Sequence, residues 1–361
     1  MRNSLWAGST GERYGALDGL RGVAAIAVAL LHYDRSLVPA GYLAVDLFFL
    51  LSGFILTRTY GPQLADGLGA GRLILKRMVR LYPLHVTGVV LFTLSVLQGL
   101  ARGRPGRMPL DDLAHSFPFN VLMLPSPYSA LLFPLNFPAW SLSFELLASC
   151  LFAAGWSRLP RPTLLAGSVV FAVMLIAATH NSPIDPDLVK RSALGDGSRW
   201  SQVPIALLRC GFAFNSGVLI GLIPAAAQTR RTDWRAGLCL IGVGALCATP
   251  IPPSFRLGPD LATVLLLWPA MVWFCSRVEL PPAMALFGAR SGELSYALYV
   301  VHAPLVAYVR GAAVRLGLPE VALAPVYLAV ALGLAALCTR WIDGPVRRAL
   351  TRRFLAAPRP G

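Results

Sequence analysis

The feature that most constrains this chain is a series of about ten apolar segments that recurs along almost its whole length. Charged residues and Pro- or Gly-rich breaks separate these segments. They span 16–33, 42–58, 78–99, 138–156, 163–179, 203–223, 236–250, 260–276, 293–314 and 321–341. A helix needs roughly 20 apolar residues to cross a bilayer. The shorter segments leave room for one or two re-entrant or merged pieces. The pattern predicts an all-α polytopic membrane protein with about ten transmembrane helices.

The intervals between the segments predict the domain organisation. The longest interval runs from about 100 to 137, and its second half is apolar and rich in proline. No interval is both long and polar enough for a soluble domain. We therefore expect a single membrane-embedded domain over residues 1–361.

The charge of the chain agrees with this fold class. Only 14% of the residues are charged, against about 25% in an ordinary soluble protein. The net charge of +15 would suggest nucleic acid as a partner of a soluble protein. No basic stretch is interleaved with aromatic residues, however, so we exclude that partner. Cytoplasmic loops of membrane proteins collect Lys and Arg. The resulting bias predicts a multi-pass protein of the cell (inner) membrane with both termini in the cytoplasm.

The six cysteines show no pattern of a disulfide framework or a metal site. No pair has CxxC spacing, and most lie inside apolar segments. We expect free cysteines packed between helices, and no metal ion.

Ionisable residues inside the apolar segments are the first functional candidates. A charged group in the hydrocarbon core costs about 2.5–3.5 kcal/mol on insertion scales. In the first segment, Arg21 and His32 are separated by ten residues. They lie within about 20° of one helical face and about 16 Å apart along the axis. Asp18 lies one turn before Arg21 and extends the same polar stripe. Arg21 alone would also fit a side chain that reaches the lipid head groups.

Further charged positions have both a structural and a functional interpretation. Asp46 lies in the second segment, where it would either act in a site or form an ion pair with Arg21 or Arg209. Arg77 and Arg80 are three residues apart at the start of the third segment, so they share a helical face. Two guanidiniums on one face suit a phosphate-bearing ligand. Basic residues at this position also anchor a helix at the cytoplasmic surface.

Polar residues in the fourth and ninth segments complete the candidate set. Glu145 lies near Ser143, and a carboxylate with a hydroxyl nearby would orient a histidine or bind a sugar. Ser295, Tyr299 and His302 follow one another at the spacing of one helical face. A hydrogen-bonded structural carboxylate and a packed histidine are the alternative interpretations of Glu145 and His302.

Together, these motifs resemble the acyltransferase 3 family of membrane O-acyltransferases over nearly the whole chain. The strongest match is LDGLRGVAAIAVALLHY, in which Arg21 and His32 fit the R-x10-H motif. The other matches, in chain order, are GYLAVDLFFLLSGFIL around Asp46, Arg77-x-x-Arg80 followed by Tyr82-Pro83, AWSLSFE ending at Glu145, a looser pattern of Arg209, Phe214 and Gly217, GELSYALYVVH ending at His302, and WIDGP at 341–345. The departures are Ala44 for a glycine, Leu146 where many members have a second Glu, and Asp343 for a Glu.

The resemblance implies transfer of an acyl group from cytoplasmic acyl-CoA to a hydroxyl. Acetyl-CoA is the expected donor. Acceptors in the family include cell-surface polysaccharides, their lipid-linked precursors, lipids and macrolides. We therefore expect a saccharide, a lipid-linked saccharide, or another cell-envelope or secondary-metabolite acceptor. Some members carry a C-terminal SGNH hydrolase-like domain. Only residues 342–361 follow the last segment here, so we expect the form without that domain.

A histidine is the expected general base, since its protonation changes near neutral pH. We expect His32 to take the proton of the acceptor during direct attack on the thioester, with Asp18 or Glu145 orienting it. His302 is the second candidate for the base. A two-step route through an acyl-histidine or an acyl group on Ser143 remains an alternative.

Arginines would serve the donor in this scheme. Arg21 would stabilise the oxyanion or the donor, and Arg77 and Arg80 would hold the CoA phosphates.

A proton-coupled secondary transporter is the alternative from another class, because spans with buried Arg, Asp, Glu and His also describe such a carrier. Transporters usually consist of two halves related by a repeat, and no repeat is visible in this sequence. A catalytically inactive membrane scaffold is a third interpretation.

Overall fold

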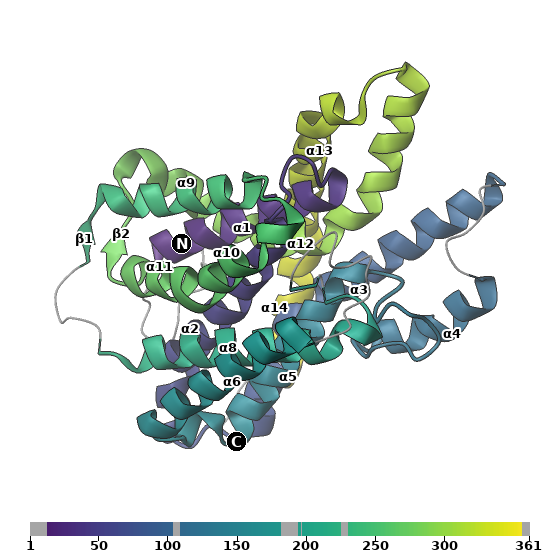
Figure 1. The fold of residues 1–361 in the computed structure, drawn as a ribbon. Helices are drawn as coiled ribbons and strands as arrows, with labels where there is room; N and C mark the ends of the chain where they lie inside the picture. Colours follow the sequence, from purple (N-terminus) through teal and green to yellow (C-terminus); the bar gives the residue numbers. More distant parts are fainter. Residues whose placement is uncertain (1–12, 104–108, 182–193, 196, 225–229, 356–361) are drawn as a thin grey trace.

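The computed structural model describes residues 13–103, 109–181, 194–195, 197–224 and 230–355, and helices dominate it (Figure 1). Within these residues, nine helices are long and apolar enough to cross a membrane. They span Gly15–Tyr33, Gly41–Ala65, Ala70–Ala101, Phe137–Ala154, Arg161–His180, Trp200–Leu222, Leu257–Cys275, Pro282–Leu316 and Glu320–Phe354. A shorter apolar helix, Trp234–Ala248, accompanies them. The prediction of an all-α polytopic membrane protein is confirmed.

The secondary-structure elements follow one another with few breaks. The N-terminal half forms α1 (Gly15–Tyr33), η1 (Gly41–Leu43), α2 (Ala44–Ala65), α3 (Ala70–Ala101), α4 (Leu110–Val121), η2 (Phe137–Ala139), α5 (Trp140–Ala154), η3 (Trp156–Arg158) and α6 (Arg161–Asn181). The C-terminal half forms η4 (Trp200–Gln202), α8 (Val203–Leu222), β1 (Arg231–Thr232), α9 (Trp234–Ala248), η5 (Pro253–Phe255), α10 (Leu257–Ala262), η6 (Thr263–Leu267), α11 (Trp268–Cys275), β2 (Val278–Glu279), α12 (Pro282–Leu316), η7 (Glu320–Leu323), α13 (Ala324–Cys338), η8 (Thr339–Asp343) and α14 (Gly344–Phe354). The two short strands pair in parallel.

Each predicted apolar segment coincides with a described helix, but some boundaries differ. α3 begins at Ala70 rather than near residue 78, and α12 begins at Pro282 rather than near 293. The added turns contain charged residues, so hydropathy excludes them, although a helix continues beyond the apolar core without penalty. α4 lies in the interval 100–137, for which no helix was predicted. Its two aspartates and Pro118 interrupt the apolar pattern there.

α1 lies near the centre of the bundle and packs most extensively on α12 (Figure 1). Glycines permit the close approach of these two helices. A Cβ atom on Gly22 would lie 2.1 Å from Ser291 Oγ, and one on Gly292 would lie 2.8 Å from Asp18 O. Small residues at a crossing are typical of membrane helices, because close backbones gain van der Waals contact that lipid cannot replace. The crossing brings the polar stripe of α1 directly against α12.

α2 and α8 form a second close pair by the same means. A Cβ atom on Gly53 would lie 2.1 Å from Phe214 O, and one on Gly217 would lie 2.0 Å from Leu50 O. Any larger residue at either glycine would push the backbones apart. This pair is therefore tightly packed, and its α2 member also packs on α1.

A proline inside α12 helps to position the segment that precedes α5. Pro304 has no backbone N–H, so Val300 O, four residues earlier, lacks its usual helical donor. Asn136 Nδ2 donates to this carbonyl at 3.3 Å, and Asn136 is buried. The contact docks the chain next to Phe137 onto α12.

Candidate active site

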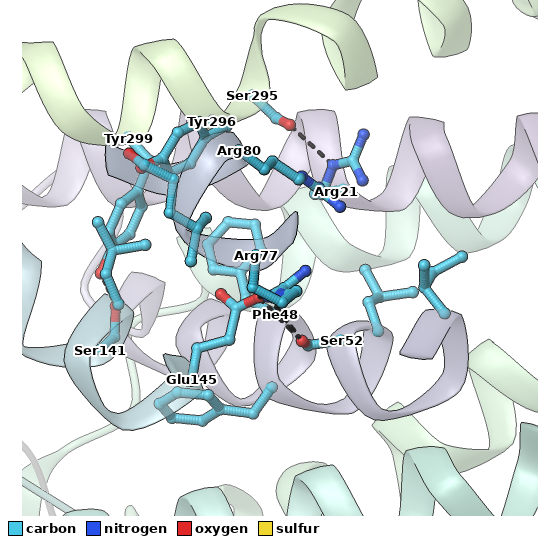
Figure 2. Close-up of a pocket in the computed structure, with 15 residues that line it drawn as sticks. Arg21, Phe48, Ser52, Arg77, Arg80, Ser141, Glu145, Ser295, Tyr296 and Tyr299 are labelled. Carbon is cyan, nitrogen blue, oxygen red and sulfur yellow. Dashed lines mark hydrogen bonds and ion pairs between the residues drawn. The ribbon is translucent and has the colours of Figure 1, made fainter. Parts of the chain in front are cut away.

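A cavity lies between α1, α2, α3, α5 and α12, and it contains most of the polar residues that the sequence singled out (Figure 2). It holds about 650 Å³ of empty space, counting the part that opens to the exterior. The lining residues are Arg21, Phe48, Phe49, Leu51, Ser52, Ile55, Arg77, Arg80, Leu81, Ser141, Leu142, Glu145, Ser295, Tyr296 and Tyr299. Three guanidiniums face one carboxylate in this lining, so the cavity favours an anionic ligand.

Arg21 joins α1 to α12 at one end of the cavity. Its Nε donates to Ser295 Oγ at 2.8 Å, and its Nη2 donates to Gly292 O at 2.8 Å. The same Nη2 donates to Asp18 Oδ1 at 3.1 Å, and Arg13 Nε bonds the other oxygen of that carboxylate at 3.2 Å. Asp18 and Arg21 also line a smaller neighbouring cavity. The polar stripe predicted for the first segment is therefore present, and Asp18 acts on Arg21.

Arg77 forms a buried ion pair with Glu145 across the cavity. Ser52 Oγ donates to the same carboxylate at 2.8 Å. The Arg77 side chain is 2% exposed and that of Glu145 is 16% exposed, so the carboxylate faces the open space. Arg80 lies one turn further along α3 and also lines the cavity. The predicted common face of Arg77 and Arg80 is present, but Arg77 lies inside the protein and not at its surface.

Tyr299 and Ser141 lie at the opposite end of the cavity from Arg21 (Figure 2). Tyr299 Oη is 2.6 Å from Ser141 Oγ and donates to Pro138 O at 2.9 Å. The ring of Phe48 contacts the Tyr299 ring edge to face, with centroids 5.4 Å apart. These side chains line the end of the cavity that lies nearest the next polar group along α1 and α12.

That next group is a pair of histidines. His32 Nδ1 lies 2.7 Å from His302 Nε2, and the two rings are parallel within 8°. The His302 ring centroid is 6.1 Å from that of Tyr299, so the pair adjoins the end of the cavity. The ring of Phe137 contacts His32 edge to face at 4.8 Å. His32 is partly exposed and His302 is fully buried, so His32 is the more accessible of the two.

Neither Asp18 nor Glu145, the residues expected to orient His32, contacts that histidine in this structure. Asp18 bonds Arg21 and Glu145 bonds Arg77, both at the cavity. His32 instead contacts His302. The rise of α1 explains the separation, because the ten residues between Arg21 and His32 place the two ends of the stripe about 16 Å apart.

Asp46 and Arg209 form a closed ion pair away from the cavity lining. Arg209 Nε donates to Asp46 Oδ1 at 3.0 Å, and Nη2 donates to Oδ2 at 2.5 Å. The other guanidinium bonds go to Gly195 O at 2.7 Å, Tyr42 O at 3.1 Å and Leu194 O at 3.5 Å. The Arg209 side chain is 0% exposed and the Asp46 side chain is 1% exposed. Of the interpretations of Asp46, the ion pair with Arg209 is the one that the structure contains, and its role is to tie α2 to α8.

Ser143 is also absent from the cavity lining, although it lies on the same helix as Ser141 and Glu145. Sequence reasoning conversely missed Ser52, which bonds Glu145, and Tyr296, which lines the cavity and donates to Leu81 O at 2.5 Å. Both stand inside motifs quoted above, so the motifs offered a signal. Phe137 had no such signal.

The described residues contain no group of three or more His, Cys, Asp and Glu side chains that could hold a metal ion.

Comparison with known proteins decides what kind of protein contains this arrangement. A family model described as an acyltransferase domain matches residues 14–340. The chain belongs to the acyltransferase 3 family. It is therefore a multi-pass membrane O-acyltransferase, and the transporter and scaffold interpretations are set aside.

Individual relatives agree with this family. Acyltransferase MdmB of Streptomyces mycarofaciens is 26% identical over 96% of this chain and 95% of its own length. Protein 2 in the picA locus of Rhizobium radiobacter is 35% identical over 47% of this chain and 96% of its own length. O-acetyltransferase OatA of Staphylococcus aureus is 34% identical over 22% of this chain and 14% of its own length. No solved structure is significantly similar to the chain.

Proposed function

We propose that this acyltransferase moves an acetyl group from cytoplasmic acetyl-CoA to a hydroxyl of a saccharide or a lipid-linked saccharide. The observation that carries the proposal is the arrangement of one cationic cavity and one accessible histidine along the same helix. The cavity would receive the donor, and the histidine would activate the acceptor. The bias of Lys and Arg toward one set of loops supports a cell-membrane location with both termini inside.

The cavity suits the phosphate-bearing part of the donor. Arg21 and Arg80 face it beside the Arg77–Glu145 pair, and guanidiniums bind phosphate oxygens through two parallel hydrogen bonds. Arg21 is held by Ser295 and Asp18, so its orientation is set before a ligand arrives.

The donor must extend from the cavity toward the histidines. Ser295 and His302 are seven residues apart on α12, or about 10 Å along its axis. Tyr299 lies between these two levels and contacts both the cavity and the histidine pair. The pantetheine arm would pass Tyr299 and present its thioester beside His32.

At that point His32 acts as the general base. Its ring takes the proton of the acceptor hydroxyl while the hydroxyl oxygen bonds to the acyl carbon. The carbon–sulfur bond then breaks, and the thiolate of CoA receives the proton from the protonated His32. The products are the acetylated acceptor and CoA with a free thiol, so every atom is accounted for.

The identity of the acyl group and of the acceptor rests on the family and on the relatives. The Staphylococcus relative is named as an O-acetyltransferase, and the Streptomyces relative is named as an acyltransferase. Aromatic rings around His32, such as Phe137, offer apolar surfaces on which a sugar face or a lipid-linked acceptor can lie.

The test uses purified protein in proteoliposomes with acetyl-CoA that is radiolabelled in the acetyl group. Soluble saccharides, lipid-linked saccharides and a macrolide are offered in separate reactions, with the His32→Ala protein as control. Label in a saccharide fraction that is absent with His32→Ala supports the proposal. Label only in the macrolide would overturn the acceptor class, and no label from acetyl-CoA together with label from a longer acyl-CoA would overturn the acetyl assignment.

A further inference from the structure

The two histidines differ in their exposure, and the proposed transfer step makes no use of this difference. His32 is partly exposed, whereas His302 is fully buried between the helices. Their facing nitrogens, His32 Nδ1 and His302 Nε2, are 2.7 Å apart. This distance requires one hydrogen between the two nitrogens, so one ring donates and the other accepts.

The second contact of His302 decides the direction of that hydrogen bond. His302 Nδ1 lies 3.1 Å from Leu298 O. A carbonyl oxygen only accepts, so His302 Nδ1 must carry a hydrogen. A neutral imidazole has a single N–H, which leaves a lone pair on His302 Nε2. A doubly protonated His302 would place a charge on a fully buried ring in a membrane helix, which is costly. His32 Nδ1 is therefore the donor, an assignment made from the hydrogen-bond network.

We propose that His302 is a positioning residue, which keeps the hydrogen of His32 on Nδ1 and thereby leaves the Nε2 lone pair free to accept a proton. The proposal rests on the role of His32 as general base in the proposed function. Without an acceptor beside Nδ1, the hydrogen would move freely to Nε2, and the reacting nitrogen would lose its lone pair. Partners of this kind set the tautomer of a histidine in many sites.

The surroundings of the pair support a positioning role for His302. Its own ring is held from the backbone by Leu298 O. Tyr327 Oη donates to His302 O at 3.3 Å and lies 3.2 Å from Ala29 O of α1, so the same tyrosine joins the two helices that carry the histidines. Phe137 contacts the ring of His32. The ring of His302 is therefore held by Leu298 O and the ring of His32 by Phe137, whereas Tyr327 joins only the backbones of the two helices.

A neutral partner also suits this position in a membrane. A carboxylate next to a neutral His32 would be a buried charge without compensation. A neutral imidazole stabilises the protonated form of His32 through the same hydrogen bond, and it adds no charge before the proton arrives. His302 therefore does the orienting that was expected of Asp18 or Glu145.

The test compares two substitutions of His302 in the complete membrane-embedded protein. His302→Leu removes the acceptor, whereas the amide oxygen of His302→Gln can reach the position of Nε2 and accept from His32. We expect His302→Leu to lower kcat about 10–100-fold, the usual cost of losing such a partner, with KM for acetyl-CoA unchanged. His302→Gln should recover most of the lost kcat.

Tyr327→Phe is the matched control. It removes a buried hydroxyl that bonds the same helices but leaves both imidazoles in place. We expect it to lower the thermal midpoint of unfolding and to keep kcat near that of the wild type. A kcat loss in His302→Leu that exceeds that of Tyr327→Phe at similar stability separates positioning from general packing.

A direct observation of the tautomer completes the test and does not depend on any variant of His302. Nitrogen NMR of ¹⁵N-histidine-labelled protein, with His32 assigned by its loss in His32→Gln, should show a hydrogen on Nδ1 and a bare Nε2. A hydrogen on Nε2 of His32 would overturn the proposal, as would wild-type kcat in His302→Leu or equal losses in the Leu and Gln variants. Full activity of His32→Ala would instead contradict the role of His32 itself.

Discussion

The cavity around Arg21 and the histidine pair at His32 lie on the same two helices but are built from opposite kinds of chemistry. The cavity gathers three guanidiniums around one carboxylate. The histidine pair is flanked by aromatic rings and contains two imidazoles joined by one hydrogen bond. The cavity is suited to holding charge, and the pair is suited to moving a proton. A substitution in the cavity should therefore change binding, and one in the histidine pair should change rate.

The Asp46–Arg209 pair is a third polar group that can be compared with these two. Like Arg77–Glu145, it is a buried arginine–carboxylate pair, yet it is closed on all sides by backbone carbonyls. Glu145 keeps 16% of its side chain exposed toward the cavity, whereas Asp46 keeps 1%. Openness toward a cavity, more than charge or burial alone, distinguishes the functional candidate from the structural pair.

The largest effect, a loss of catalytic rate, is expected at the histidine pair. His32→Ala should lower kcat about 10²–10⁴-fold, because it removes the general base, and should leave KM for acetyl-CoA unchanged. The measurement is steady-state transfer of radiolabelled acetyl groups by protein with an unchanged thermal midpoint. Retention of more than a tenth of wild-type kcat would show that His32 is not the base.

The next largest effect, a loss of stability, is expected at the buried Asp46–Arg209 ion pair. Asp46→Ala should destabilise the protein by about 3–5 kcal/mol, since removal of one partner leaves a buried charge uncompensated. The thermal midpoint of the detergent-solubilised protein and its yield from membranes should both fall. Protein that remains folded should bind acetyl-CoA normally. A stable variant with weakened binding would place Asp46 in the site.

A smaller effect is expected at the cavity. Arg80→Ala should weaken acetyl-CoA binding by about 10–100-fold, which corresponds to the loss of a hydrogen bond between charged groups. Arg80→Lys should restore the affinity only in part, because an ammonium lacks the planar fork of a guanidinium. Titration of acetyl-CoA against purified protein provides the measurement. Equal affinity in the wild type and Arg80→Ala would make Arg80 a topology anchor only.

The smallest effect concerns the two-step alternative. Ser143→Ala should change kcat by less than about twofold, since the half-buried Ser143 does not line the cavity. Rapid-mixing kinetics with labelled acetyl-CoA should show no acyl-enzyme before the acceptor is added. Trapped label on Ser143, or a large fall in kcat, would favour the two-step route.

Features set by residues close together in the sequence could be predicted, whereas contacts between distant segments could not. The helices and the Arg21–His32 stripe follow from local periodicity, and the motifs placed Arg80, Glu145 and Ser295 among the candidates. The pairing of His32 with His302 could not be predicted, because it depends on how α1 crosses α12 through Gly22 and Gly292.

The contacts of the carboxylates depend on tertiary structure in the same way, whereas α4 was missed for a local reason. Asp18 and Glu145 are plausible partners of a histidine by residue type, and only the depth of each residue along its helix shows that they bond arginines instead. α4 was missed because its helical face carries too few apolar residues to be recognised as a membrane segment.

In the proposed mechanism, donor and acceptor reach His32 from opposite ends of the polar stripe that runs from Arg21 to His32. Sealed proteoliposomes of known orientation test it most directly. Acetyl-CoA is supplied only on the side of the Arg21 cavity, and an impermeant acceptor is confined to the other side. We expect the acceptor to become acetylated while CoA stays on its own side, and we expect His32→Ala to abolish the transfer. Transfer only when both substrates share the Arg21 side would contradict the claim.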